Sequence, residues 1–216
     1  MIPTYKIGVL GSWHLGSVYS VVLAELGNKV ISFDIGKNMA GSFNKILPPV
    51  QESGLAELIE KKVSQGQLVF VDKIKDFALC DIIWLAVDMP INKDGRPDFS
   101  FIKKVFKDLI PVLRDGVVIV ISSQVPIGTG RIFQKIVRKA RPDLKFSYAY
   151  QPENLQLGRA LESFFKPARV VIGVDDQKAE AIMKNIFSPL RVPVLVMDIV
   201  SAEMVKHALN SFLAAS

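Results

Sequence analysis

The segment from residue 7 to residue 34 has residue types and a spacing that suit the binding of a dinucleotide. An apolar run at residues 7–10 leads into the sequence G-S-W-H-L-G at residues 11–16, and Asp34 follows a second apolar run at residues 30–33. The first glycine allows a sharp turn out of a strand, and the last allows a helix to pack closely on the sheet. Backbone N–H groups at the start of that helix bind pyrophosphate, and an acid about 20 residues further on binds ribose hydroxyls.

One position of this turn departs from the usual G-x-G-x-x-G pattern, because Trp13 replaces the second glycine. Its indole could shield the pyrophosphate or fill the space that a glycine leaves open. His14 could donate a hydrogen bond to a phosphate, or it could pack over the turn as an ordinary loop side chain. Asp34 favours NAD over NADP, because a carboxylate repels a 2′-phosphate. The cofactor-binding residues expected in this segment are Gly11, Ser12, Trp13, His14, Leu15, Gly16 and Asp34.

Composition indicates a soluble, enzyme-like domain. The chain has 216 residues, half of them hydrophobic, which is enough for one large core. No apolar run is long enough to cross a bilayer, and no signal peptide precedes the first strand. Cys80 is the single cysteine, which rules out an internal disulfide, favours the cytoplasm and predicts a small buried thiol. The net charge of +6 comes from basic residues that are scattered along the sequence, so nucleic-acid binding is not expected.

Apolar runs alternate with helical patterns along the whole chain. Because the runs are continuously apolar, they indicate parallel strands that are covered on both faces. The alternation predicts an α/β fold, a Rossmann-like, doubly wound and mostly parallel sheet of six or more strands. Strands are expected at residues 7–10, 30–33, 68–71, 81–87, 117–121, 146–150, 169–173 and 192–196. Helices are expected after Gly16, at residues 54–65, 99–113, 128–139 and 177–187, and from residue 201 to the end.

Several later segments resemble motifs of one enzyme family, and they occur in the family's order. Residues 123–129, S-Q-V-P-I-G-T, resemble its S-T-V-P-x-G-T loop, and residues 152–158, P-E-N-L-Q-L-G, resemble P-E-F-L-x-E-G. Residues 201–210, S-A-E-M-V-K-H-A-L-N, match S-A-E-x-x-K-x-x-x-N, and residues 49–55 match P-x-x-E-x-G-L. Asp98 matches the acid of a G-x-x-D segment. The chain therefore resembles the NAD-binding domain of the UDP-glucose and UDP-N-acetylmannosamine (nucleotide-sugar) dehydrogenases, in a divergent branch with G-x-W-H-x-G.

The resemblance implies an NAD-dependent oxidation of the C6 alcohol of a UDP-sugar to the acid in two hydride transfers. It implies that Lys206 stabilises negative charge on the reacting oxygen and that Asn210 supplies a neutral donor on the same helix face. Glu153 would be the base that activates water and would also lie near the cofactor, while Gln124 replaces a threonine of the family and could hold a water. Val87, Asp88 and Ser123 would line the cofactor site, and no metal is implied.

Simpler interpretations remain open at the sequence level. Lys206 alone could be a solvated helix residue, and Glu153 alone could be an acid at a helix start. Met89 and Leu157 also replace a threonine and an acid of the family. Together with Trp13 and Gln124, they leave open a catalytically degenerate, nucleotide-binding or regulatory module. A dehydrogenase of the 6-phosphogluconate or hydroxyacyl-CoA type has the same architecture but lacks the motifs quoted above.

The predicted domain organisation is an NAD-binding domain at residues 1–198 and the start of a connecting central helix at residues 199–216. Because the helical pattern continues to the last residue, we expect a piece of a longer protein. In the family, a catalytic cysteine and a substrate domain follow this helix, and dimers form largely through it. The expected partners are therefore a UDP-sugar and a second copy of the chain.

Overall fold

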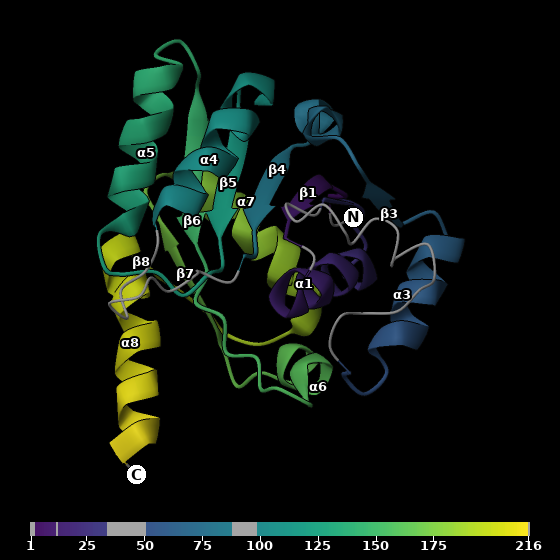
Figure 1. Ribbon diagram of the computed structural model, residues 1–216. Helices are drawn as coiled ribbons and strands as arrows, with labels where there is room; N and C mark the ends of the chain where they lie inside the picture. Colours follow the sequence, from purple (N-terminus) through teal and green to yellow (C-terminus); the bar gives the residue numbers. More distant parts are fainter. Residues whose placement is uncertain (1–2, 12, 34–50, 88–98, 216) are drawn as a thin grey trace.

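Eight strands form a single sheet between two layers of helices (Figure 1). The computed structural model describes residues 3–11, 13–33, 51–87 and 99–215. The strand order is β3-β2-β1-β4-β5-β6-β7-β8, in which the first six strands have the order expected for two βαβ halves. The strands are β1 (Lys6–Leu10), β2 (Lys29–Phe33), β3 (Leu68–Val71), β4 (Ile82–Leu85), β5 (Val117–Ile121), β6 (Phe146–Tyr150), β7 (Val170–Val174) and β8 (Val194–Met197).

The helices divide between the two faces of the sheet. Side chains of α1 (His14–Glu25), α3 (Leu55–Ser64), α6 (Ala160–Phe165) and α7 (Gln177–Phe187) contribute to the core on one face. Side chains of α4 (Phe99–Leu109), α5 (Thr129–Ala140) and α8 (Ile199–Ala215) contribute to the core on the other. Short 3₁₀ helices lie at Ile74–Leu79, Ile110–Val112 and Ser188–Leu190.

The central strands are buried on both faces, as their sequences predict. In β4, Ile82 and Trp84 belong to one core, whereas Ile83 and Leu85 belong to the other. Successive side chains of a strand point to opposite faces, so a strand covered on both sides must be apolar at every position. The predicted Rossmann-like, mostly parallel sheet is therefore confirmed.

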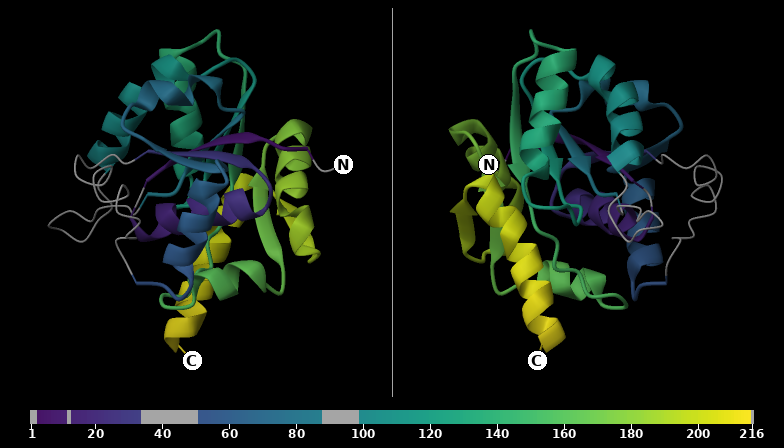
Figure 2. Two further views of the ribbon diagram at one scale, coloured as in Figure 1. Left: turned by 90° about the vertical axis from the view of Figure 1, so that its right-hand side faces the viewer. Right: turned by 60° about the vertical axis from the view of Figure 1, so that its left-hand side comes forward.

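A reversal of strand direction after β6 determines where the last helix begins. β7 pairs with β6 in the antiparallel direction, and β8 is parallel to β7. Gly173 lies opposite Tyr150, the last residue of β6, and also opposite Met197, the last residue of β8. The start of α8 is consequently held at the carboxyl end of β6, and a Cβ at Gly173 would come within 2.6 Å of Ala202 on that helix. From there α8 extends beyond the body of the domain (Figure 2).

Most elements agree with the sequence prediction to within a few residues. The last helix starts at Ile199 instead of residue 201, and the helix expected at residues 99–113 ends at Leu109 and continues as a 3₁₀ turn. Helix α6 and the 3₁₀ helix at Ile74–Leu79 were not predicted, because each is too short to show a period. Ser12, Asp34, Asp88, Met89 and Asp98 lie outside the described residues, as do residues 48–50.

Candidate functional site

The turn after β1 has the geometry that its two glycines predict. Gly11 has a φ of 116°, and a Cβ on it would lie 2.3 Å from the carbonyl oxygen of Ala86. A Cβ on Gly16 would lie 1.9 Å from the carbonyl oxygen of Gly11. Both positions therefore exclude any side chain, and the first turn of α1 packs directly on the loop. Leu15, the second residue of α1, is buried.

Trp13 fits this turn without backbone strain. Its φ is −74°, a value that every residue type adopts easily, and its carbonyl oxygen accepts the first helical hydrogen bond of α1, from the N–H of Ser17. The indole is 58% exposed, so it does not fill an interior space. Its side chain makes no capping hydrogen bond to α1. The start of this helix therefore keeps the character of an anion-binding site, with an exposed aromatic ring beside it.

His14 has a partner that sequence reasoning did not identify. Its Nε2 lies 2.6 Å from Oε1 of Glu52, a buried carboxylate just before α3. Burial alone would raise the pKa of Glu52. Hydrogen bonds from the amides of Ala160 and Gly158 and from His14 outweigh burial and lower that pKa. His14 thus contacts a buried carboxylate at the start of α1, a partner that neither interpretation from the sequence anticipated.

The ends of β4 and β5 are joined by Ser123. Its hydroxyl oxygen accepts a hydrogen bond from the backbone N–H of Val87 at 3.1 Å, and its carbonyl oxygen accepts one from the hydroxyl of Tyr150 at 3.1 Å. Val87 and Ser123 are both buried, whereas Gln124 is exposed. Ser123 therefore fixes the loop that carries Gln124 in place at the carboxyl edge of the sheet.

Glu153 and Lys206 form an ion pair at this edge. Nζ of Lys206 lies 2.6 Å from Oε1 of Glu153, and the two side chains are 10% and 16% exposed. The other carboxylate oxygen accepts a hydrogen bond from the amide of Leu155 at 3.0 Å. Asn210 follows Lys206 one turn later on α8 and is half-buried. Because α6 begins at Ala160 and Lys206 is buried, neither the helix-start interpretation of Glu153 nor the solvated-helix interpretation of Lys206 is correct.

Two further side chains of α8 hold that helix against the loop after β5. The carboxylate of Glu203 accepts hydrogen bonds from the amides of Gly128 and Gly130, at 2.5 and 2.7 Å, and so caps α5. Burial raises the pKa of Glu203, although these amides oppose the shift. Nε2 of His207 lies 2.8 Å from the carbonyl oxygen of Val125. Sequence reasoning missed both roles, although an acid within an otherwise apolar helix start was a signal.

A buried polar network lies directly behind Glu153. Gln151 accepts hydrogen bonds from the hydroxyls of Tyr19 and Ser122, and its amide group donates to the carbonyl oxygen of Pro152 at 2.8 Å. The indole N–H of Trp84 donates to the Ser122 hydroxyl at 2.9 Å. Because buried polar groups are costly to leave unpaired, this network fixes the chain direction just before Glu153.

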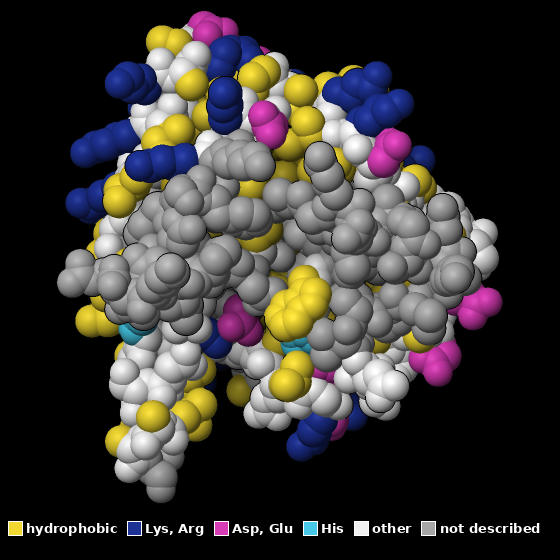
Figure 3. All heavy atoms as spheres, viewed as in Figure 1, with side chains coloured by type: hydrophobic (Ala, Val, Ile, Leu, Met, Phe, Trp, Pro, Cys, Tyr) yellow, Lys and Arg dark blue, Asp and Glu magenta, His cyan; other side chains and the backbone are white. Residues whose placement is uncertain are grey.

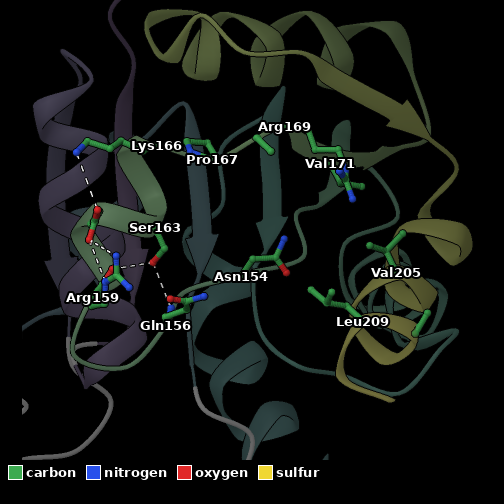
Figure 4. A pocket seen from close by; sticks show the side chains of 13 residues that line it. Asn154, Gln156, Arg159, Ser163, Lys166, Pro167, Arg169, Val171, Val205 and Leu209 are labelled. Carbon is green, nitrogen blue, oxygen red and sulfur yellow. Dashed lines mark hydrogen bonds and ion pairs between the residues drawn. The ribbon is translucent and has the colours of Figure 1, made fainter. Parts of the chain in front are cut away.

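A cavity of about 700 Å³ is lined by Asn154 and Val205, the sequence neighbours of the two residues of the ion pair (Figure 4). It lies between the segment after Glu153, α6 and α8, with Asn154 on one side and Val205 and Leu209 on the other. Arg159, Lys166 and Arg169 give it a cationic rim, of which Arg159 and Lys166 pair with Glu162.

The basic residues are less scattered in space than in the sequence. Lys and Arg side chains gather over α5 (Figure 3), where Arg131, Lys135, Arg138 and Lys139 are exposed. Their helical spacing was a signal that the sequence reading did not use. No helix among the described residues has the length and apolar character to span a membrane.

Comparisons with known proteins find similarity over almost the whole chain. The model of the UDP-glucose/GDP-mannose dehydrogenase family, NAD binding domain, matches residues 5–191. UDP-glucose 6-dehydrogenase TuaD of Bacillus subtilis is 38% identical over 211 residues, which cover 97% of this chain and 46% of that protein. The structure of a UDP-glucose dehydrogenase from Pyrobaculum islandicum matches with a TM-score of 0.93 and 32% identity, covering 99% of this chain and 50% of the other. The chain thus spans about half the length of these relatives.

Proposed function

Because the chain belongs to the UDP-glucose/GDP-mannose dehydrogenase family, we propose that it is the NAD-binding part of a UDP-sugar 6-dehydrogenase. The whole enzyme would oxidise the C6 alcohol of a UDP-sugar to the acid in two hydride transfers. NAD is the cofactor of the matched domain family. The observation that carries the proposal is the ion pair of Glu153 and Lys206, which lies at the same carboxyl edge of the sheet as the dinucleotide turn after β1.

The chain's own residues suit the cofactor. Neither Gly11 nor Gly16 has room for a Cβ, because it would overlap backbone atoms of the turn. The turn is therefore tight, and backbone amides at the start of α1 can approach a pyrophosphate closely. Bound NAD would supply the hydride acceptor.

The ion pair suits the chemistry of alcohol oxidation. The ammonium group of Lys206 would stabilise the negative charge that develops when the alcohol loses its proton, with Asn210 as a neutral donor beside it. The Glu153 carboxylate, which the Leu155 amide orients, would accept a proton from the water that completes the acid. Gln124 is exposed on the neighbouring loop and could hold that water.

The cofactor part of the proposal is tested by titrating the chain with NAD⁺. Of the two tryptophans, Trp13 is exposed beside the turn and Trp84 is fully buried, so NAD⁺ should quench Trp13 selectively. Trp13→Phe should remove most of the fluorescence change while calorimetry still detects binding. NADP⁺ should bind more weakly, because Asp34 would repel its 2′-phosphate. A folded chain that gives no heat with NAD⁺ would contradict the proposal.

The catalytic part is tested in the complete reading frame. With a UDP-sugar and NAD⁺, the protein should form two NADH per sugar, and Lys206→Ala should lower turnover roughly 100-fold. Turnover that is unchanged by this substitution would remove Lys206 from the mechanism. Cofactor binding without any turnover would favour the degenerate nucleotide-binding module instead.

We also propose the division into an NAD-binding domain at residues 1–198 and a connecting helix from residue 199, with homodimer formation through α8. Met204 and Phe212 are exposed apolar side chains on this helix, and such side chains favour burial against a partner. Sedimentation should detect a dimer that Phe212→Asp weakens. A cytoplasmic location is proposed from the single cysteine.

A further inference from the structure

The carboxylate of Glu52 joins three segments that are far apart in the sequence. Its Oε1 accepts a hydrogen bond from the amide of Gly158 at 2.8 Å and lies 2.6 Å from Nε2 of His14. Its Oε2 accepts a hydrogen bond from the amide of Ala160 at 3.1 Å. The side chain of Glu52 is almost completely buried. One carboxylate thus connects the start of α1, the start of α6 and the segment before α3.

Burial makes these three contacts depend on one another. A buried carboxylate is stable only while donors satisfy it, and loss of one donor weakens the site by more than the bond itself contributes. A shift of His14 therefore disturbs the same oxygen that holds the Gly158 amide.

Two of the three connected segments lead to the two halves of the proposed site. His14 is the first residue of α1 and follows Trp13 in the dinucleotide turn. On the other side, the Gly158 amide belongs to the segment that starts at Glu153, whose carboxylate accepts the Leu155 amide.

We propose that Glu52 is a positioning residue that couples occupancy of the dinucleotide turn to the placement of residues 153–160. The coupling passes from the turn through His14 and the Glu52 carboxylate to the amides of Gly158 and Ala160. It deepens the proposed function, because it rests on dinucleotide binding at the start of α1. It also assigns a role to the P-x-x-E-x-G-L motif, which the catalytic scheme leaves without one.

The coupling is measurable by hydrogen exchange of individual amides in the 216-residue chain. Saturating NAD⁺ should slow exchange of the Gly158 and Ala160 amides by about fivefold or more, a typical size for coupling between sites. The Ala179 amide is the matched control, because the carboxylate of Asp176 caps it in the same way, at 2.8 Å, at the start of α7. Its exchange should not respond to NAD⁺.

Two substitutions of His14 separate the coupling from a general loss of structure. His14→Gln retains an N–H donor near the position of Nε2 and should keep the response to NAD⁺. His14→Phe retains an aromatic ring without a donor, so the Gly158 and Ala160 amides should no longer respond, even at NAD⁺ concentrations that calorimetry shows to be saturating. Glu52→Gln should lose the response as well.

A response that persists in His14→Phe, or its absence in the NAD⁺-saturated original chain, would overturn the proposal. A chain that binds no NAD⁺ would contradict the proposed function separately, and the unliganded variants would then decide the role of Glu52. Without ligand, His14→Phe should speed exchange of Gly158 relative to Ala179, whereas His14→Gln should not. Equal exchange in the two variants would leave Glu52 no coupling role.

Discussion

Replacing Lys206 with methionine should destabilise the fold, because it leaves the Glu153 carboxylate without its cation. Methionine retains most of the length and apolar character of the lysine stem, so the change removes the charge more than the packing. Breaking a fully buried ion pair costs about 3–5 kcal/mol, and an exposed pair contributes about 0–1 kcal/mol. This pair is 10% and 16% exposed, and the Leu155 amide still binds the carboxylate.

We therefore expect a loss of about 2 kcal/mol, between these limits. For a chain of this length, that loss lowers Tm by about 4–8 °C. Thermal unfolding followed by circular dichroism measures it. Lys184→Met is the matched control, because Lys184 pairs with Glu180 at 2.5 Å but the side chains are 48% and 35% exposed. Its expected cost is about 0.3–0.5 kcal/mol.

The double variant Lys206→Met/Glu153→Gln removes both charges and should recover about half of the lost stability, since no unpaired carboxylate remains. Equal melting temperatures for Lys206→Met and Lys184→Met would refute the reasoning. They would mean that Glu153 is well solvated without its partner, and that the pair is no more than a surface contact.

Three other predictions concern the turn, the thiol and acid stability. Gly16→Ala should lower the free energy of unfolding in urea by about 3 kcal/mol, because its Cβ would overlap the Gly11 carbonyl oxygen. The control Gly66→Ala, at φ 65° in open space, should lower it by about 1 kcal/mol. Similar losses in the two variants would show that the turn can relax around the added Cβ. Burial raises the pKa of the Cys80 thiol to about 11, so at neutral pH it stays protonated and should react with a thiol reagent only as fast as the chain unfolds. Rapid reaction of the folded chain would contradict this. The pKa of Glu52 is lower in the folded chain, so its contribution to stability is present at neutral pH and is lost as pH falls through that value. The Glu52→Gln variant should therefore be less stable than the original chain at neutral pH, and its stability should fall less as the pH is lowered. An equal fall in stability in both chains would contradict this prediction.

The fold could be predicted because its signals are local. Continuous apolar runs indicated strands covered on both faces, and β4 and β5 have that form. The requirement for glycine at residues 11 and 16 was also local, since it follows from a turn and a helix start that are adjacent in the chain. The prediction that Cys80 is a small buried thiol is also confirmed, and its signal was local as well, because Cys80 lies just before an apolar strand. Helix α6 escaped prediction because six residues are too few to show a helical period.

The partners of the charged side chains depended on tertiary structure. The motifs named Glu153 and Lys206 separately, and they became a pair because the reversal at β7 returns α8 to the carboxyl end of β6. Likewise, nothing near residue 14 indicates that its imidazole meets Glu52, or that Glu52 also binds two amides more than 100 residues further along.

The sequence by itself therefore determined the layered sheet, the dinucleotide turn and the family, because apolar periodicity and backbone conformation act between neighbouring residues. Only the tertiary structure decided which buried charges compensate one another. Desolvation makes every buried carboxylate need a donor, but the donor is supplied by whichever segment the strand register brings beside it.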